Sequence, residues 1–302
     1  MAVIEIDGLH KRYGDTIAVR DVSFAVDEGE IFGILGRNGA GKTTTVECLA
    51  GLRRPDAGMV RALGLDPQQD RSALRQVLGI QLQASKIAER LRVREALDLF
   101  ASFYDKPADI DELLRLLDLE EKQHTQFRRL SGGQQQRLSI ALALIGNPRV
   151  AVLDELTTGL DPRARRDTWE MIERVRASGV TIVLVTHFMA EAQRLCDRIA
   201  VIDAGSVVAI DSPAGLVARV DTGQHLSFRP STRFDLAMLT ELPEVHDARE
   251  DDGQILVTGG TELVQAVTAV LARNHIVAHE LRVDQADLDD AFVELTGHRF
   301  DS

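Results

Sequence analysis

The pattern of hydrophobic and polar positions divides the chain into three stretches, and the first has the alternation of a sheet. Residues 3–6 and 17–26 alternate between apolar and polar side chains, as strands with one buried face do. Residues 31–35 form a continuous apolar run, which is typical of a strand buried on both faces. A helical pattern follows over 44–52. We therefore predict strands here, one of which leads through a glycine-rich loop into a helix.

From about residue 84 to 146 the pattern becomes helical, and strands then return. One helical face collects the apolar side chains of Val93, Ala96, Leu97, Phe100 and Tyr104. A helix over 132–145 is followed by apolar strands over 150–153 and 181–185, with a further helix between them. Strands that alternate with helices predict an α/β fold with a parallel sheet, which here carries a helical insertion.

Past Pro213 the periodicity restarts and gives the order β-α-β-β-α-β. That order predicts a small ferredoxin-like α+β domain. We therefore expect two domains, one over 1–220, with its helical part at about 84–146, and an accessory domain over 221–302. A length of 302 residues fits two domains of ordinary size.

The acidic balance of the chain argues against nucleic acid as a partner. The formal net charge is -12 and the sequence pI is near 5.2. From residue 224 onward there are fifteen Asp and Glu but only six Arg and no Lys, so most of the excess lies in the last quarter. A phosphate backbone is bound mainly through Lys and Arg. We therefore expect no nucleic-acid partner.

Cysteine and histidine usage excludes some kinds of site. Cys48 and Cys196 both fall in apolar helical contexts, which predicts buried, reduced thiols. The eight histidines are scattered, so no histidine metal cluster is expected. The chain has neither a signal-peptide pattern nor an apolar run of about 18 residues. We therefore expect a soluble cytoplasmic protein.

A glycine-rich loop follows residues 31–35 and matches the phosphate-loop pattern GxxxxGKT. Glycines let the backbone approach an anion, and the helix start offers unpaired N–H groups. Lys42 would reach the β- and γ-phosphate oxygens, and Thr43 would give its hydroxyl to Mg²⁺. The residues expected at the nucleotide are Gly36, Asn38, Gly39, Ala40, Gly41, Lys42, Thr43 and Thr44.

Two acids and a histidine end strands of the predicted sheet. Asp154 and Glu155 follow residues 150–153, and Thr186-His187 follows 181–185. Successive strand residues point in opposite directions, so the two acids should do different work. We expect Asp154 to serve Mg²⁺ and Glu155 to polarise the attacking water. At the same sheet edge, His187 would sense or hold the γ-phosphate.

A second glycine-rich element, Leu130-Ser131-Gly132-Gly133-Gln134, opens the helix over 132–145. Its helix N-terminus would again offer N–H groups to an anion. Few phosphate-loop proteins carry such an element. Two anion-binding helix N-termini in one chain suggest a nucleotide that is bound from two sides.

These elements, in this order, resemble the nucleotide-binding subunit of an ABC transporter over roughly residues 2–215. The resemblance implies that Ser131, Gly132, Gly133 and Gln134 act on ATP held by the phosphate loop of the opposite subunit. It further implies that Tyr13 stacks on adenine and that His187 is the switch histidine.

The resemblance also assigns Gln83 to the link between Mg²⁺, water and the membrane partner, with Gln81 as a rival for that position. Asp161, within 159–161, would belong to the loop that acts across the dimer. Leu82 and Leu156 stand where the family usually has proline, which puts the rigidity of these two loops in question.

Within the family, the resemblance is to the ATPases of type-2 exporters, similar to those for daunorubicin-like antibiotics. Two segments carry it, 187–198 and 288–297. It implies ATP and Mg²⁺ as cofactors, a head-to-tail homodimer or a pair with a related ATPase, and a separate transmembrane permease. The protein would lie on the cytoplasmic face of the membrane and power efflux of a drug, antibiotic or similar amphipathic substrate.

Two alternatives remain open at this stage. One is a soluble ABC ATPase that acts on ribosomes or DNA. The other is an exporter or importer ATPase for lipid, ion or polysaccharide. Substrate selection belongs to the membrane partner. The C-terminal domain would support dimerisation, with regulation or added stability as the alternatives.

Overall fold

The computed structural model describes residues 1–81, 87–219, 224–232, 235–251, 253–284 and 287–297. The chain forms two compact units, Met1–Pro213 and Ala214–Ser302. Each unit has its own hydrophobic core and is described by itself.

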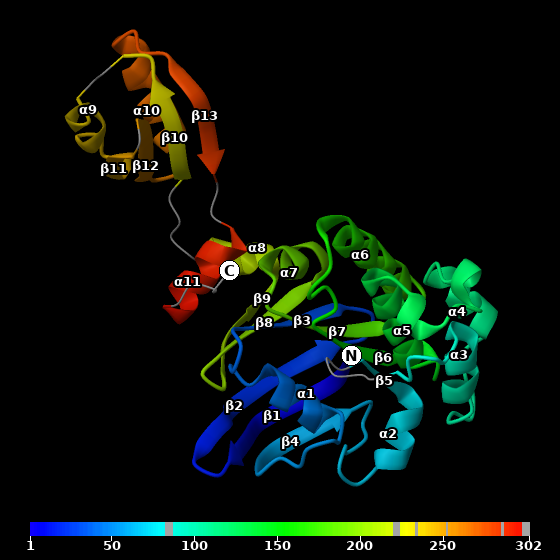
Figure 1. The fold of residues 1–302 in the computed structure, drawn as a ribbon. Helices are drawn as coiled ribbons and strands as arrows, with labels where there is room; N and C mark the ends of the chain where they lie inside the picture. The colour runs from blue at the N-terminus through cyan, green and yellow to red at the C-terminus, as the bar shows by residue number, and fades with distance from the viewer. Residues whose placement is uncertain (82–86, 220–223, 233–234, 252, 285–286, 298–302) are drawn as a thin grey trace. The chain divides into compact units, whose positions relative to one another are not determined.

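In the described residues of the first unit, nine strands form one mixed sheet (Figure 1). Their order across the sheet is β4-β1-β2-β9-β8-β3-β7-β6-β5. The strands are β1 (Ala2–Tyr13), β2 (Thr16–Asp27), β3 (Ile31–Leu35), β4 (Ala57–Ala62), β5 (Leu78–Gln81), β6 (Val150–Asp154), β7 (Thr181–Thr186), β8 (Arg198–Asp203) and β9 (Ser206–Asp211).

The strands from β8 to β5 pair in parallel, and β1 pairs antiparallel with β2 and β4. Strands β3, β6 and β7 are buried at every position, because helices cover both faces of a parallel sheet. Leu35 is in register with Thr186, and Asp154 with Val185. Three strands therefore end at one edge, where their following loops meet.

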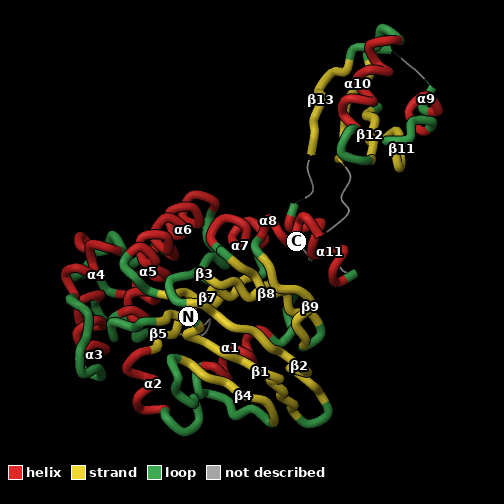
Figure 2. Tube along the Cα trace, turned by 180° about the vertical axis from the view of Figure 1, so that it is seen from behind, coloured by secondary structure: helices red, strands yellow, loops and turns green. Residues whose placement is uncertain are grey.

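Helices and turns connect these strands. They are α1 (Lys42–Leu49), α2 (Arg71–Val77), α3 (Val93–Ala101), α4 (Ile110–Leu116), the 3₁₀ turns Glu120–Lys122 and Phe127–Arg129, α5 (Gly132–Leu144), α6 (Pro162–Ala177) and α7 (Met189–Leu195). Figures 1 and 2 show α3, α4 and α5 gathered at one side of the sheet. The predicted α/β architecture is confirmed, but the sheet is mixed rather than wholly parallel, because β1–β2, β1–β4 and β8–β9 pair antiparallel.

The second unit contains a four-stranded antiparallel sheet in the order β11-β12-β10-β13. Leu226, Phe228, Ile255 and Val257 point from this sheet into a core shared with Val267. Its elements are α8 (Pro213–Arg219), β10 (Gln224–Pro230), α9 (Ala237–Thr240), β11 (Val245–Asp251), β12 (Gln254–Gly259), α10 (Leu263–Arg273), β13 (Ala278–Asp284) and α11 (Leu288–Thr296).

Candidate nucleotide site

The loop between β3 and α1 contains glycines whose replacement by any other residue would require the neighbouring backbone to move. A Cβ on Gly36 would lie 2.3 Å from the carbonyl oxygen of Ile202. Gly41 has φ +104°, and a Cβ there would lie 2.5 Å from the carbonyl oxygen of Ala18. The loop backbone is thus packed against the sheet, and its N–H groups precede the N-terminus of α1.

Lys42 folds back over this loop. Its Nζ donates hydrogen bonds to the carbonyl oxygens of Gly36, at 2.7 Å, and Arg37, at 3.0 Å. Burial lowers the pKa of the Lys42 ammonium, and the nearby carboxylates of Glu155 and Asp154 oppose that shift. The amine is therefore held across the loop where a phosphate would enter.

A hollow of about 510 Å³ opens in front of the loop. Tyr13, at the end of β1, stands in its wall with 40% of its surface exposed. Cationic groups of Lys11 and Arg53 lie 5.4 Å and 5.9 Å from the centre of the Tyr13 ring. The lining consists of Tyr13, Ala18, Asn38, Gly39, Gly41, Lys42, Thr43, Thr44 and Glu155.

Asp154 ends β6 and is almost completely buried, with 2% of its surface exposed. Burial and, after it, the neighbouring Glu155 raise its pKa to about 6, against the attraction of Lys42. Its Oδ1 is buried without a hydrogen-bond partner. A buried carboxylate oxygen without a partner is costly unless a cation completes it.

Glu155 and His187 face each other across the ends of β6 and β7. His187 Nδ1 lies 3.4 Å from Glu155 Oε1, and this buried nitrogen forms no hydrogen bond. Glu155 has φ +50°, a left-handed conformation that is rare for a glutamate. Its N–H donates to the carbonyl oxygen of Val185, at 2.9 Å, so pairing with β7 holds this backbone in place.

The second glycine-rich element forms a helix cap. Ser131 Oγ accepts from the Gln134 N–H at 3.3 Å, and Gln134 Oε1 accepts from the Ser131 N–H at 3.1 Å. Residues 131–134 are absent from the described lining of the phosphate-loop hollow. Gly133 instead lies beside Ala164 of α6, since a Cβ placed on Gly133 would be 3.6 Å from the Cβ of Ala164. The structure therefore separates the two glycine-rich elements within one chain.

Asp161 caps α6, since its Oδ1 accepts from the N–H groups of Arg163 and Ala164. These hydrogen bonds, that from Ala164 most, lower the pKa of the Asp161 carboxyl. Gln83 and Leu82 lie outside the described residues. Leu156, the other position that departs from the family pattern, is buried with 1% of its surface exposed.

Comparison with known proteins fits this geometry. Residues 19–158 match the family model described as ABC transporter. The daunorubicin resistance ATP-binding protein DrrA3 of Streptomyces coeruleorubidus is 36% identical over 97% of this chain and 96% of its own length. The chain belongs to the ABC transporter family. It is an ATP-hydrolysing subunit of that family.

Other ABC transporter proteins extend the likeness. The Nod factor export ATP-binding protein I of Paraburkholderia xenovorans (strain LB400) is 37% identical over 98% of this chain and 97% of its own length. A solved ATP-binding subunit of an ABC transporter has a TM-score of 0.64 and 29% identity, covering 72% of this chain and 92% of that one. A dimeric bacterial ABC transporter cassette has a TM-score of 0.60 and 27% identity, covering 69% and 98%.

No helix among the described residues is both long and apolar enough to cross a bilayer. ABC cassettes dimerise and pair with membrane permease subunits.

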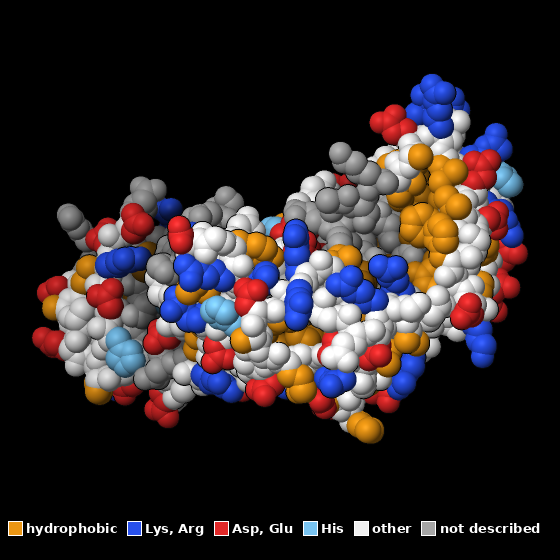
Figure 3. Space-filling model, turned by 90° about the horizontal axis from the view of Figure 1, so that it is seen from below, with side chains coloured by type: hydrophobic (Ala, Val, Ile, Leu, Met, Phe, Trp, Pro, Cys, Tyr) orange, Lys and Arg blue, Asp and Glu red, His pale blue; other side chains and the backbone are white. Residues whose placement is uncertain are grey.

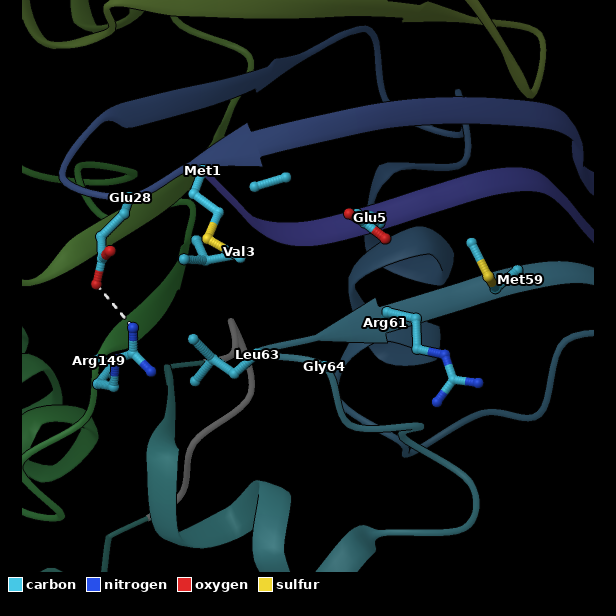
Figure 4. A pocket seen from close by; sticks show the side chains of 10 residues that line it. Met1, Val3, Glu5, Glu28, Met59, Arg61, Leu63, Gly64 and Arg149 are labelled. Carbon is cyan, nitrogen blue, oxygen red and sulfur yellow. Dashed lines mark hydrogen bonds and ion pairs between the residues drawn. The ribbon is translucent and has the colours of Figure 1, made fainter.

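A second hollow, of about 400 Å³, lies beside the starts of β1 and β6 (Figure 4). Glu28 and Arg149 form an ion pair across it at 2.7 Å, while Arg61 points away from that pair. None of the residues that the ABC resemblance assigns to the site lies in its described lining. The predicted nucleotide residues Lys42, Thr43 and Thr44 line the other hollow, in front of the loop between β3 and α1.

The sequence did not predict the buried hydrogen bond between Gln81 and Asp154. Gln81, the rival of Gln83, is buried at the end of β5, and its Oε1 accepts from the Asp154 N–H at 3.1 Å. The signal was a glutamine within an otherwise apolar strand. Gln81 therefore supports the backbone of Asp154.

Proposed function

We propose that the chain is the ATP-binding and hydrolysing subunit of an exporter that moves a drug, antibiotic or similar amphipathic substrate through a separate membrane subunit. The observation that carries this proposal is the meeting of Lys42, Asp154, Glu155 and His187 beside one hollow. Relatives that match almost the whole chain bear names of drug resistance or export.

The roles follow from position and chemistry. The loop N–H groups and Lys42 bind and orient the phosphates, which supplies most of what phosphoryl transfer requires. Glu155 accepts a proton from the attacking water, and His187 beside it contacts the γ-phosphate. Tyr13 offers an exposed ring to adenine. Gln83 keeps the role implied by the resemblance, which links the site to the permease.

Mg²⁺ fits the residues present. Asp154 Oδ1 has no hydrogen-bond partner, and Thr43 lines the hollow with a hydroxyl. The described residues contain no group of three acids, histidines or cysteines placed to hold a metal. Mg²⁺ is commonly held by one or two carboxylates together with substrate phosphates and water. When bound, it would neutralise charge on the phosphates, with Asp154 and Thr43 as its protein partners.

We propose that the active form is a head-to-tail dimer, either of this chain or with a related ATPase. Gly132 and Gly133, at the N-terminus of α5, offer helix N–H groups outside the phosphate-loop hollow of their own chain. A head-to-tail arrangement lets them contact ATP bound to the partner. A solved cassette of similar fold is dimeric.

The permease would dock on the helical part of the first unit. Phe103, just after α3, and Leu99 in α3 expose 63% and 47% of their surfaces. Figure 3 shows a patch of hydrophobic side chains on the side where Figure 1 draws α3 and α4. Exposed apolar patches mark interaction surfaces. Docking there would hold the protein on the cytoplasmic face of the membrane as a peripheral subunit.

For the second unit we propose a ferredoxin-like fold, supported by its element order and antiparallel sheet. We propose dimer support as its role. The acidic balance of residues 224–302 supports a partner other than nucleic acid.

The first test replaces Glu155 by Gln. We expect ATP affinity within about twofold of wild type and a loss of kcat of at least about 100-fold, because the general base is removed while the phosphate loop is kept. Fluorescent-nucleotide binding and phosphate release measure the two quantities. The variant should also accumulate as an ATP-bound dimer in size-exclusion chromatography.

Glu121→Gln, at an exposed site in the 3₁₀ turn after α4, serves as the matched control and should hydrolyse ATP normally. Near-normal hydrolysis by Glu155→Gln would overturn the site assignment. Identification of the co-purifying membrane protein, followed by transport assays on the pair, tests export and its cargo.

A further inference from the structure

Two helices begin at two segments that the proposed mechanism uses. Helix α6 starts directly after Asp161, which would face the other subunit, and α7 starts directly after His187-Phe188. The two helices lie side by side in both views (Figures 1 and 2). Helix α7 is therefore one of the elements that a displacement of α6 would reach directly.

Three side-chain contacts join the two helices at regular intervals. The Arg165 guanidinium lies 4.5 Å from the centre of the Phe188 ring, and Trp169 Nε1 donates to Glu191 Oε1 at 3.1 Å. Arg194 and Glu173 form an ion pair at 3.1 Å. The partners on α6 are four residues apart, and those from Phe188 onward are three apart. Residues with these spacings lie on one face of a helix. We call these three pairs the α6–α7 ladder.

The first pair leads straight to the catalytic histidine. The Phe188 ring packs on the His187 ring, with 4.1 Å between their centres, and His187 Nδ1 lies 3.4 Å from Glu155. Arg165 Nε is buried without a hydrogen-bond partner, and none of the described carboxylates forms an ion pair with this residue. The aromatic face of Phe188 is then the group that the guanidinium engages.

The second pair is a hydrogen bond between the two helices to a buried carboxylate. Glu191 is completely buried, yet only its Oε1 is hydrogen-bonded, and its Oε2 has no partner. A buried carboxylate with one donor is a poor source of stability. Its value is the definite position that it gives to Trp169 and hence to α6. The third pair is exposed and screened by water, so it adds little.

We propose that Arg165 and Phe188 are positioning residues, through which the position of α6 determines the position of the His187 ring. The inference rests on the proposed roles of His187 and Asp161. When α6 shifts as the dimer closes, the guanidinium moves with it, and the Phe188 and His187 rings follow. Closure of the dimer interface is thereby coupled to the contact between His187 and the γ-phosphate.

The test compares Arg165→Lys, Phe188→Leu and Phe188→Tyr with Arg194→Gln from the exposed third pair. Lysine keeps the charge but loses the planar guanidinium, and leucine loses the ring. Both variants should lower kcat by about tenfold to thirtyfold, with ATP affinity within about twofold and a Hill coefficient for ATP closer to 1. Phe188→Tyr and Arg194→Gln should keep kcat within about twofold.

A double-mutant cycle with His187→Ala separates positioning from a merely structural effect. If Phe188 acts through His187, adding Phe188→Leu to His187→Ala should cost less than about twofold in residual phosphate release. If the double variant instead loses phosphate-release activity by the product of the two single-variant factors, the proposal is overturned. An equal loss from Arg194→Gln, or a loss confined to ATP affinity, would overturn it too.

The outcome also distinguishes this inference from the proposed function. Wild-type hydrolysis by Glu155→Gln or His187→Ala would show that the catalytic assignment is wrong. If those variants are inactive while Arg165→Lys and Phe188→Leu hydrolyse normally, only the positioning role is wrong. Thermal melting of each variant checks that it is folded.

Discussion

Asp154 illustrates at the scale of one residue how burial changes the chemistry of a carboxylate. Its charge is disfavoured by burial and by Glu155, and it is favoured only in part by Lys42, so its pKa rises to about 6. Lys42 experiences the reverse balance, since burial lowers its pKa while both acids oppose the shift. In the absence of ligand, this buried group of charges is a source of instability, which phosphate and a cation would relieve.

We predict that Asp154→Asn stabilises the ligand-free protein at pH 7.5, with a rise in Tm of about 2–4 °C. The folded pKa of about 6 exceeds the ordinary 3.8, so between these values the folded state binds more protons and stability falls as pH rises. The gain from Asp154→Asn should therefore shrink as pH falls through 6 towards 4. Differential scanning fluorimetry without nucleotide or Mg²⁺ measures it.

Asp105→Asn, at an exposed position, is the control and should leave Tm at pH 7.5 unchanged. A lower Tm for Asp154→Asn at pH 7.5 would contradict the assigned direction of the shift. The same titration predicts weaker Mg²⁺ binding below about pH 6, because a carboxylate ligand must be deprotonated.

The residues predicted from sequence and those missed differ in how their partners are arranged along the chain. Lys42 and the loop glycines act with near neighbours, so a short motif defines them. Gln81 contacts Asp154 across 73 residues, and Trp169 contacts Glu191 across 22. Such pairs depend on strand order and helix packing, which no local pattern contains.

At the scale of elements, the fully buried strands were the easiest to predict. Strands β3, β6 and β7 are short apolar runs bounded by glycine or polar residues, and their bounds agree within about one residue. Strand β4 was not predicted, because three of its six residues are exposed at the sheet edge. The hairpin formed by β8 and β9 was not predicted either. Its turn consists of Ala204 and Gly205, which both have positive φ.

The start of α5 gives a prediction at this scale. Ser131 both caps a helix and belongs to the second glycine-rich element, residues 130–134, which we call the signature. Ser131→Ala removes the acceptor for the Gln134 N–H and should cost about 1 kcal/mol, or about 2–4 °C in Tm. Ser131→Asn restores a capping acceptor and should recover Tm, while ATP hydrolysis stays low in both variants. ATP affinity of the monomer should not change, because Ser131 lies outside the phosphate-loop hollow.

Asp109→Ala is the matched comparison, because Asp109 caps α4 in the same way without belonging to the signature. It should lower Tm and leave hydrolysis near wild type. Recovery of hydrolysis by Ser131→Asn together with Tm would show instead that Ser131 acts only as a cap.

At the scale of the whole molecule, the chain is two units with separate cores. Helix and strand periodicity predicted a change of architecture past Pro213, and the structure divides between Pro213 and Ala214. The first core is built on strands of the mixed sheet, and the second on β10, β12 and α10. The expected domain boundary at residue 220 stays a prediction, and so does the role of the second unit in dimerisation.

Separate cores predict separate unfolding. In scanning calorimetry of Glu155→Gln, we expect two transitions, of which only that of the first unit responds to ATP and Mg²⁺. Nucleotide at about 100 times its Kd adds about 2.7 kcal/mol to the unit that binds it, or roughly 5–10 °C. Lys42→Ala should remove that shift, because the phosphates lose their cation, and leave the second transition in place. A single transition that moves as a whole with nucleotide would contradict this prediction, because it would mean that the two cores unfold as one.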